Sequence, residues 1–185
     1  GVSGIAICMF ILAYGFNSAT YKLSEENLAA MQLNIAGDSM NGMIGQEYSS
    51  DVAFKGALKE ALGAKKASEY ESELIKAAIS MNPMVILFGI IGFVASFAIS
   101  LGPVMWVLFS ELFPNNIRGL AISFVGLINS GVSTIVQTVF PWELDTLGNA
   151  TTFLIYGVFA VMGLVFIIKV LPETKGKSLE QLEKE

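Results

Sequence analysis

The stretch Ile99-Ser100-Leu101-Gly102-Pro103-Val104-Met105-Trp106 lies near the middle of a long apolar run, residues 82–113, in which Glu111 is the single charged residue. A straight helix of that length would measure about 48 Å, against a hydrocarbon core of about 30 Å in a bilayer. Pro103 lacks the N–H that would bond the carbonyl four residues earlier, and Gly102 permits non-helical backbone. The sequence therefore predicts a membrane helix broken at Gly102 and Pro103. Backbone groups freed by such a break are tolerated where protein or a water-filled cavity satisfies them, so the break indicates a cavity.

The composition of the whole chain is that of a membrane protein. Apolar residues make up 54% of the chain and charged residues only 15%. Four runs carry no charge, and each is near or beyond the ~20 residues that cross a bilayer. We therefore expect an all-α integral membrane protein with four transmembrane helices. The runs are residues 1–21, 83–110, 119–142 and 146–168.

These runs, with the polar segments between them, predict the organisation of the chain. Because the chain opens at Gly1 inside an apolar run and without an initiating methionine, it looks like a piece of a longer protein. We expect, in order, a transmembrane helix at 1–20, an extracytoplasmic insertion with amphipathic helices at 21–81, a broken transmembrane helix at 82–113, a cytoplasmic loop at 114–119, a transmembrane helix at 120–140, a short outer loop at 141–151, a transmembrane helix at 152–171 and a cytoplasmic tail at 172–185.

Several classes of function are poorly supported. The chain has a single cysteine, Cys8, and no histidine, so it lacks the usual ingredients of a disulfide, a metal site or a Ser-His or Cys-His nucleophile pair. We expect no enzyme activity, no metal and no cofactor. The net charge of −5 reflects mainly residues 21–80, and no basic surface suits nucleic acid.

The insertion at 21–81 is polar and water-exposed. Phe54, Leu58 and Leu62 recur every four residues in an Ala-, Lys- and Glu-rich sequence, which predicts one or two amphipathic helices with a break near Gly63. Two interpretations remain open: an external lid or partner-binding element, or a loop insertion that packs on the membrane face. We favour the second, since loops tolerate insertion.

The run at 120–140 has a polar face. At about 100° per residue, Gly126, Asn129, Ser130, Ser133 and Gln137 fall within roughly a third of the helix circumference. Lipid cannot satisfy amides and hydroxyls, so such a face turns toward protein or an aqueous path. Interhelical hydrogen bonding is the alternative, and we favour the wall of a cavity.

Basic residues indicate the orientation. By the positive-inside rule, the loop with Arg118 and the lysine-bearing tail belong in the cytoplasm, opposite the base-free outer loop, whereas the lysines of the long insertion disagree. Glu111 and Arg118 lie at helix ends whose partial charges disfavour them, and Glu173 reaches the same rim. They form a charge latch or are ordinary flanking charges, and spacing alone does not decide between the two.

Three motifs in this order resemble a known family. They are Gly102-Pro103-x-x-Trp106, Ser110-Glu111-Leu112-Phe113-Pro114 with Arg118-Gly119, and Pro172-Glu173-Thr174-Lys175-Gly176. The pattern resembles the sugar porter family of the major facilitator superfamily, and most closely the bacterial xylose–proton symporter and its glucose-transporter relatives. The resemblance implies the last four of twelve helices, in a fold whose two six-helix bundles rock about a central sugar site.

The resemblance also implies roles for individual residues. Trp106 is similar to the tryptophan that packs against the sugar ring, with Phe97 on the same wall, and Asn129 to the amide that bonds sugar hydroxyls. Glu111, Arg118 and Glu173 resemble members of the cytoplasmic latch. Ser130 stands where many relatives place tryptophan, and Ser133 where another amide is common, so we expect sugar preference or affinity to differ from the xylose carrier.

The implied function is alternating-access transport of a pentose or hexose such as xylose or glucose across the cell (inner) membrane, with the tail in the cytoplasm. The implied partners are the sugar, the lipid bilayer and an N-terminal bundle of the same protein. Proton symport and uniport both stay open, because these spans contain no Asp, Glu or His at membrane depth. The alternatives are a transporter-like sugar sensor, a carrier of a non-sugar solute and, less well supported, a membrane scaffold.

Overall fold

Five helices form the membrane part of the protein in a computed structural model, which describes residues 1–30 and 40–170 apart from the side chains of residues 29–30 and 109–112. Three stretches within them are long and apolar enough to cross a bilayer: 83–108, 118–146 and 149–170. The first helix is apolar but shorter, at 16 residues. The all-α membrane class is therefore confirmed. The helices are α1 (Val2–Asn17), α5 (Pro83–Ile99), α6 (Leu101–Leu112), α7 (Arg118–Thr146) and α8 (Asn149–Val170).

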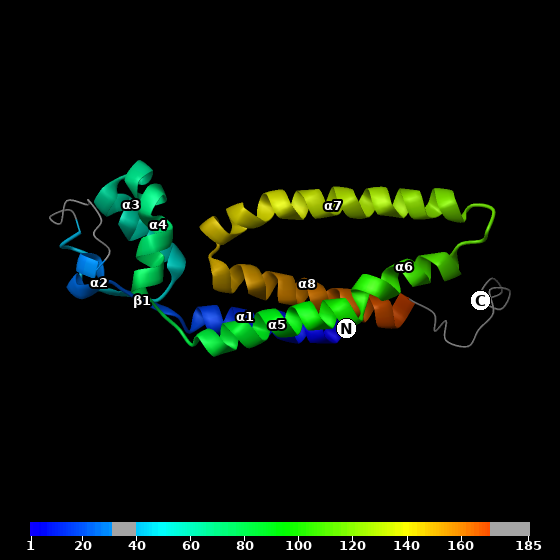
Figure 1. Ribbon diagram of the computed structural model, residues 1–185, viewed down its shortest axis with the longest axis horizontal. Coiled ribbons are helices and arrows are strands. Elements are labelled where there is room, and N and C mark those ends of the chain that lie inside the picture. The colour runs from blue at the N-terminus through cyan, green and yellow to red at the C-terminus, as the bar shows by residue number, and fades with distance from the viewer. Residues whose placement is uncertain (31–39, 171–185) are drawn as a thin grey trace.

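Helix α1 is the centre of the packed bundle, because it contacts both α5 and α8 along its length (Figure 1). Small residues allow the close approach. A Cβ atom added at Gly4 would lie 2.4 Å from Ser96 Oγ, and one at Gly15 would lie 2.6 Å from Ile86 Cδ1. Membrane helices associate through such close packing rather than through a hydrophobic driving force. Cys8 is buried in this packing, as expected for an unpaired cysteine.

The broken helix is present, but its break lies at Ser100, two residues before the predicted Gly102 and Pro103. Ser100 has φ −122° and ψ −84°, which separates α5 from α6. This position places Pro103 in the first turn of α6, where a missing N–H costs no intrahelical bond. Ser100 also satisfies two carbonyl groups at the end of α5. Its N–H donates to the Phe97 carbonyl at 3.2 Å and its hydroxyl donates to the Ser96 carbonyl at 2.6 Å.

Helix α7 is longer than expected. We expected a loop at 141–151, whereas the helix continues through Pro141 to Thr146 and only residues 147 and 148 connect it to α8. A proline removes one backbone hydrogen bond, but the following turn has others: Leu147 N–H donates to the Glu143 carbonyl at 2.8 Å, and the Thr146 hydroxyl to the Trp142 carbonyl. The extra turn carries the acidic residues of the expected loop.

The insertion forms a small unit with its own core at one end of the membrane helices, opposite the α6–α7 loop (Figure 1). Its two longer helices meet at Gly63, which has φ +77°, at the break that the sequence predicts. A three-stranded antiparallel sheet of order β2-β1-β3 was not predicted. Its elements are β1 (Thr20–Lys22), α2 (Glu25–Ala30), β2 (Glu47–Tyr48), α3 (Asp51–Leu62), α4 (Ala64–Ala78) and β3 (Ile79–Ser80).

Periodic apolar residues build the core of the insertion. Phe54 and Leu58 of α3 and Leu74 of α4 are almost completely buried, and the Phe54 ring stacks on Tyr21 of β1 at 5.6 Å between centroids. Since β1 continues from α1 and β3 leads into α5, this core is built directly on two membrane helices. The described part of the insertion is therefore an extension of the bundle.

Candidate functional site

The predicted polar face of α7 is exposed in the structure except at Gly126, which is half-buried. Asn129, Ser130 and Ser133 are exposed, and no residue of α7 is buried. Gln137 Nε2 donates to Ser133 Oγ at 3.0 Å, which leaves the Ser133 hydroxyl hydrogen available to another acceptor. Hydroxyl and amide groups thus follow one face of α7, and the assignment of this face to the wall of a polar path stays a prediction.

The aromatic half of the predicted site lies at the helix break. Trp106 of α6 is 50% exposed and Phe97 of α5 is 48% exposed. The Phe97 ring lies beside the first turn of α6, because a Cβ added at Gly102 would be 3.8 Å from Phe97 Cε1. The break thus places Phe97 and Trp106 on consecutive helical segments, on either side of Ser100.

The structure does not bring the two halves into contact. Among the described residues, Asn129, Ser130 and Ser133 make no hydrogen bond to α5 or α6, and α6 meets α7 mainly at the turn between them. The predicted sugar-contacting residues are therefore accessible on two separate helices, and their joint role in one site remains a prediction.

The predicted latch is described only at Arg118. Its Nε donates to the Phe113 carbonyl at 3.1 Å, so the guanidinium caps the C-terminal end of α6. The Glu111 side chain and Glu173 lie outside the described residues. Their pairing with Arg118 stays a prediction.

The end of α7 nearest the insertion is attached to α8 and, through α8, to α1 by an aromatic cluster of Phe16, Phe140, Phe153 and Tyr156. Phe153 stacks on Phe16 at 5.4 Å and meets Phe140 edge-on at 6.4 Å, while Phe140 meets Tyr156 at 5.8 Å. The Tyr156 hydroxyl donates to Glu143 Oε2 at 3.0 Å. Ring pairs of this kind add about 0.5–1.5 kcal/mol each beyond the area they bury.

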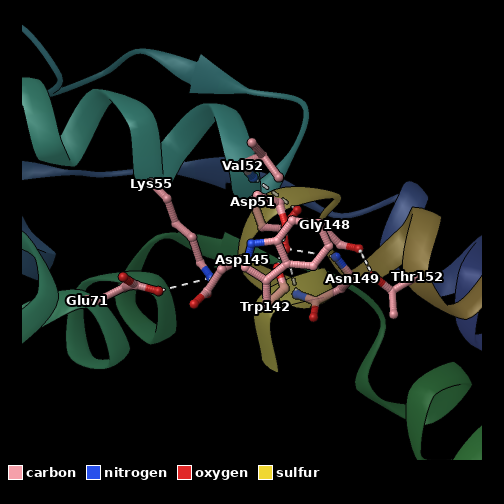
Figure 2. A network of polar contacts seen from close by, with 10 residues as sticks. Asp51, Val52, Lys55, Glu71, Trp142, Asp145, Gly148, Asn149 and Thr152 are labelled. Atoms are coloured by element: carbon pink, nitrogen blue, oxygen red, sulfur yellow. Dashed lines mark hydrogen bonds and ion pairs between the residues drawn. The ribbon is translucent and has the colours of Figure 1, made fainter. Parts of the chain in front are cut away.

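A polar network joins the insertion to the α7–α8 turn (Figure 2). Asp51, only 6% exposed, accepts from Asn149 N at 2.9 Å and from Asn149 Nδ2 at 2.7 Å, both at Oδ2. Its Oδ1 accepts from Val52 N at 3.0 Å. One carboxylate therefore lies at the N-termini of α3 and α8 together, where the partial positive charge of both helices stabilises it. These helix ends compensate for much of the cost of burying the charge.

A second contact of the network is the ammonium group of Lys55, one turn along α3. Its Nζ lies 2.8 Å from Asp145 Oδ1 of α7 and 3.0 Å from Glu71 Oε1 of α4. Burial lowers the pKa of Lys55, but the hydrogen bonds and charges of Asp145 and Glu71 outweigh burial and raise it above its usual 10.5. Lys55 is thus charged at physiological pH and ties α7 to the insertion.

The negative charge of Asp51 also affects the core of the insertion. Burial, with a contribution from Asp51, raises the pKa of the Tyr21 phenol to about 12. Asp51 therefore lies where β1, α3 and the α8 N-terminus meet. Sequence reasoning missed this residue, because its partners lie almost a hundred positions away and the only local signal is a Ser-Asp pair at a helix start.

A hollow of about 360 Å³ lies between the end of α1 and the start of α8. None of its lining residues belongs to α6 or α7, so it is distinct from the predicted sugar-contacting residues. Its lining is apolar apart from Tyr14, Asn17 and Thr151, and it lies on two helices that span or enter the membrane.

The broken helix, the polar face of α7 and the membrane-spanning lengths indicate an integral membrane protein. A family model described as "Sugar (and other) transporter" matches residues 64–185, and the chain belongs to this family. The match includes α4 and all the membrane helices after the insertion.

Curated relatives agree with the family. The chain is 48% identical over 92 residues to the zebrafish (Danio rerio) facilitated glucose transporter member 10 of solute carrier family 2, which is 50% of this chain and 18% of the relative. It is 39% identical over 95 residues to the arabinose-proton symporter of Bacillus subtilis, 51% of this chain and 20% of the relative. It is 39% identical over 107 residues to the glucose transporter GlcP of Staphylococcus epidermidis, 58% and 24% respectively.

The chain spans about a fifth of the length of the curated relatives that it matches. No solved structure matches it. The relatives named as facilitated transporters and as proton symporters both fall within the same range of identity.

Proposed function

We propose that the protein to which this chain belongs carries a pentose or hexose across the cell membrane by alternating access. The observation that supports this most strongly is the exposed polar face of α7, with Asn129, Ser130 and Ser133, on a helix long enough to span a bilayer. Neutral amides and hydroxyls bind sugar hydroxyls without the strength of a charge, so the sugar can also be released. Membership of the sugar transporter family and the names of the curated relatives agree with this role.

Trp106 and Phe97 would supply the aromatic part of the site. A pyranose presents C–H faces that pack on an indole or phenyl ring, and its hydroxyls then point toward polar groups at the edge. The break at Ser100 supports this role, since discontinuous membrane helices lie at the substrate sites of secondary transporters. Ser130 and Ser133 leave a roomier site than tryptophan and an amide would.

The orientation that we propose places the insertion outside the cell and the tail in the cytoplasm. The α6–α7 loop with Arg118 lies at the opposite end of the helices from the insertion (Figure 1). The positive-inside rule assigns that loop to the cytoplasm. Glu111, Arg118 and Glu173 would then form a cytoplasmic latch. The spans at 83–110 and 119–142 hold no Asp, Glu or His, so a proton-coupling group, if the protein is a symporter, lies elsewhere in it.

Counterflow of labelled xylose, glucose, galactose and arabinose into liposomes bearing the full-length gene product tests the proposal. We expect at least one of these sugars to accumulate against unlabelled sugar of the same kind. Saturable binding without flux would replace transport with sugar sensing. Folded protein that neither binds nor exchanges any of the four would overturn the sugar assignment. Addition of a protonophore during net uptake then separates symport, which it inhibits, from uniport, which it leaves unchanged.

A further inference from the structure

The insertion is attached to the membrane helices at both ends of its sequence and at one further place. Strand β1 follows α1 and strand β3 precedes α5, so chain continuity ties the unit to two helices. The network of Asp51, Lys55, Asp145 and Asn149 adds the α7–α8 turn. The insertion therefore contacts the outer ends of four helical segments rather than standing on a single flexible stalk.

Helix α7 depends on this attachment more than the other helices do. It has no buried residue, and apart from the bond of Arg118 to the Phe113 carbonyl its ring contacts and tertiary hydrogen bonds among the described residues lie at or beyond Phe140. Residues 118–139 have few contacts with α8 among the described residues, whereas the turn beyond Pro141 is held by Phe140, Glu143 and Asp145. Pro141 lies at the junction of the two parts, and a proline in a helix removes one hydrogen bond and permits bending.

The geometry of the turn shows that the contact is built rather than incidental. Gly148 has φ +81°, and a Cβ there would lie 2.6 Å from Asp51 Oδ1 and 3.0 Å from Val52 Cγ2. Thr152, which is 1% exposed, closes the turn by donating its hydroxyl to the Gly148 carbonyl at 2.8 Å. Figure 2 shows these groups converging on the Asp51 carboxylate. Gly148 thus adopts a positive φ, which residues with a Cβ rarely adopt, at the point where α3 meets the α7–α8 turn.

We propose that the insertion is a brace: it holds the outer ends of α7 and α8 fixed to α1 and α5 throughout the transport cycle, so that α7 moves only inward of Pro141. Asp51 and Lys55 are the positioning residues of this brace. The inference rests on the proposed function, since it assigns a mechanical part in transport to a unit that is remote from Trp106 and Asn129. It excludes a lid, because a lid would have to detach from the α7–α8 turn in each cycle.

A reversible crosslink distinguishes a brace from a lid. In a form of the full-length protein with Cys8→Ser and any other native cysteine replaced by serine, the pair Asp51→Cys and Asn149→Cys removes the network when reduced and replaces it with a covalent link when oxidised. For a brace, we expect the reduced form to exchange sugar about fivefold more slowly than the Cys8→Ser parent. Oxidation should restore at least half of the lost rate. Oxidised protein that is inactive until dithiothreitol is added would show a lid, and reduced protein with the parental rate would show that no brace is needed.

Matched controls keep the test independent of the sugar assignment. Lys55→Gln should slow sugar exchange, because it removes the contact with Asp145. Lys59→Gln should leave sugar exchange unchanged, because Lys59 lies exposed one turn further along α3. Hydrogen exchange of residues 141–152, measured without any sugar, should rise in Asp51→Asn and stay unchanged in Lys59→Gln. If the parent protein moves no sugar but hydrogen exchange still rises in Asp51→Asn, the brace is retained and the transport function is rejected. Unchanged hydrogen exchange in Asp51→Asn would reject the brace.

Discussion

Replacing Gly148 by alanine should loosen the junction between the insertion and the membrane helices by about 2–4 kcal/mol. Two costs add at this position. Its φ of +81° disfavours any residue with a Cβ, and that Cβ would lie 2.6 Å from Asp51 Oδ1 in a site already filled by Val52. The carboxylate would have to move away from Asn149, which leaves a buried charge with fewer donors.

Local hydrogen exchange in detergent measures this effect directly. Amides of residues 51–58 and 145–152 should exchange faster in Gly148→Ala, because local opening of the junction becomes cheaper. Gly45→Ala is the matched control, since Gly45 has φ +82° but no atom within 4 Å of an added Cβ. It should show only the backbone cost, about 1–2 kcal/mol, within the insertion. Equal exchange at 145–152 in the two variants would contradict the packed contact.

Replacing Trp106 by alanine should lower kcat/KM for sugar transport by about 100-fold. The proposed site uses the indole as a flat apolar surface for the sugar ring, and alanine removes both the buried area and the preferred stacking geometry. Trp106→Phe should recover part of the loss, because a smaller aromatic plane remains. Binding of the same sugar, measured by equilibrium dialysis, should weaken in parallel with transport.

The second tryptophan of the chain is the natural control. Trp142 is 62% exposed in the turn of α7 that follows Pro141, and tryptophan is common near the ends of membrane helices, at the membrane–water interface. Trp142→Ala should keep transport within about threefold of the parent, since no sugar contact is assigned to it. A larger loss at Trp142 than at Trp106 would move the site away from α6.

Much of the membrane architecture could be predicted because hydropathy reports it directly. The charge-free runs gave α5, α6 and α8 to within a few residues, and the four-residue spacing of Phe54, Leu58 and Leu62 with Gly63 gave the two helices of the insertion. The break was predicted at Gly102 and Pro103, two residues after its position in the structure. Proline is tolerated in the first turn of a helix, so α6 begins before Pro103 and the break lies at Ser100. The helix predicted at 120–140 ends six residues before α7 does, because α7 continues through Pro141 to Thr146.

The missed features share a physical cause, which is that they depend on distant residues. Strands of two or three residues have too few positions to show alternation, so the sheet left no pattern. Asp51 and Lys55 look like ordinary helix-surface charges until Asn149 and Asp145 are placed beside them. The α7 residues of the candidate site were predictable for the opposite reason, because the spacing of polar residues along one helix is enough to show that they share a face.

The account depends most directly on whether the polar face of α7 lines a sugar path. A cysteine at Ser133, on that face, and a cysteine at Ile135, about 200° around the helix, provide the comparison in a full-length protein with Cys8→Ser and any other native cysteine replaced by serine. A membrane-impermeant thiosulfonate should inhibit transport by Ser133→Cys, and the transported sugar should slow this inhibition, while Ile135→Cys stays unmodified in lipid. Equal modification of the two, or no protection by any sugar that the protein carries, would contradict the account.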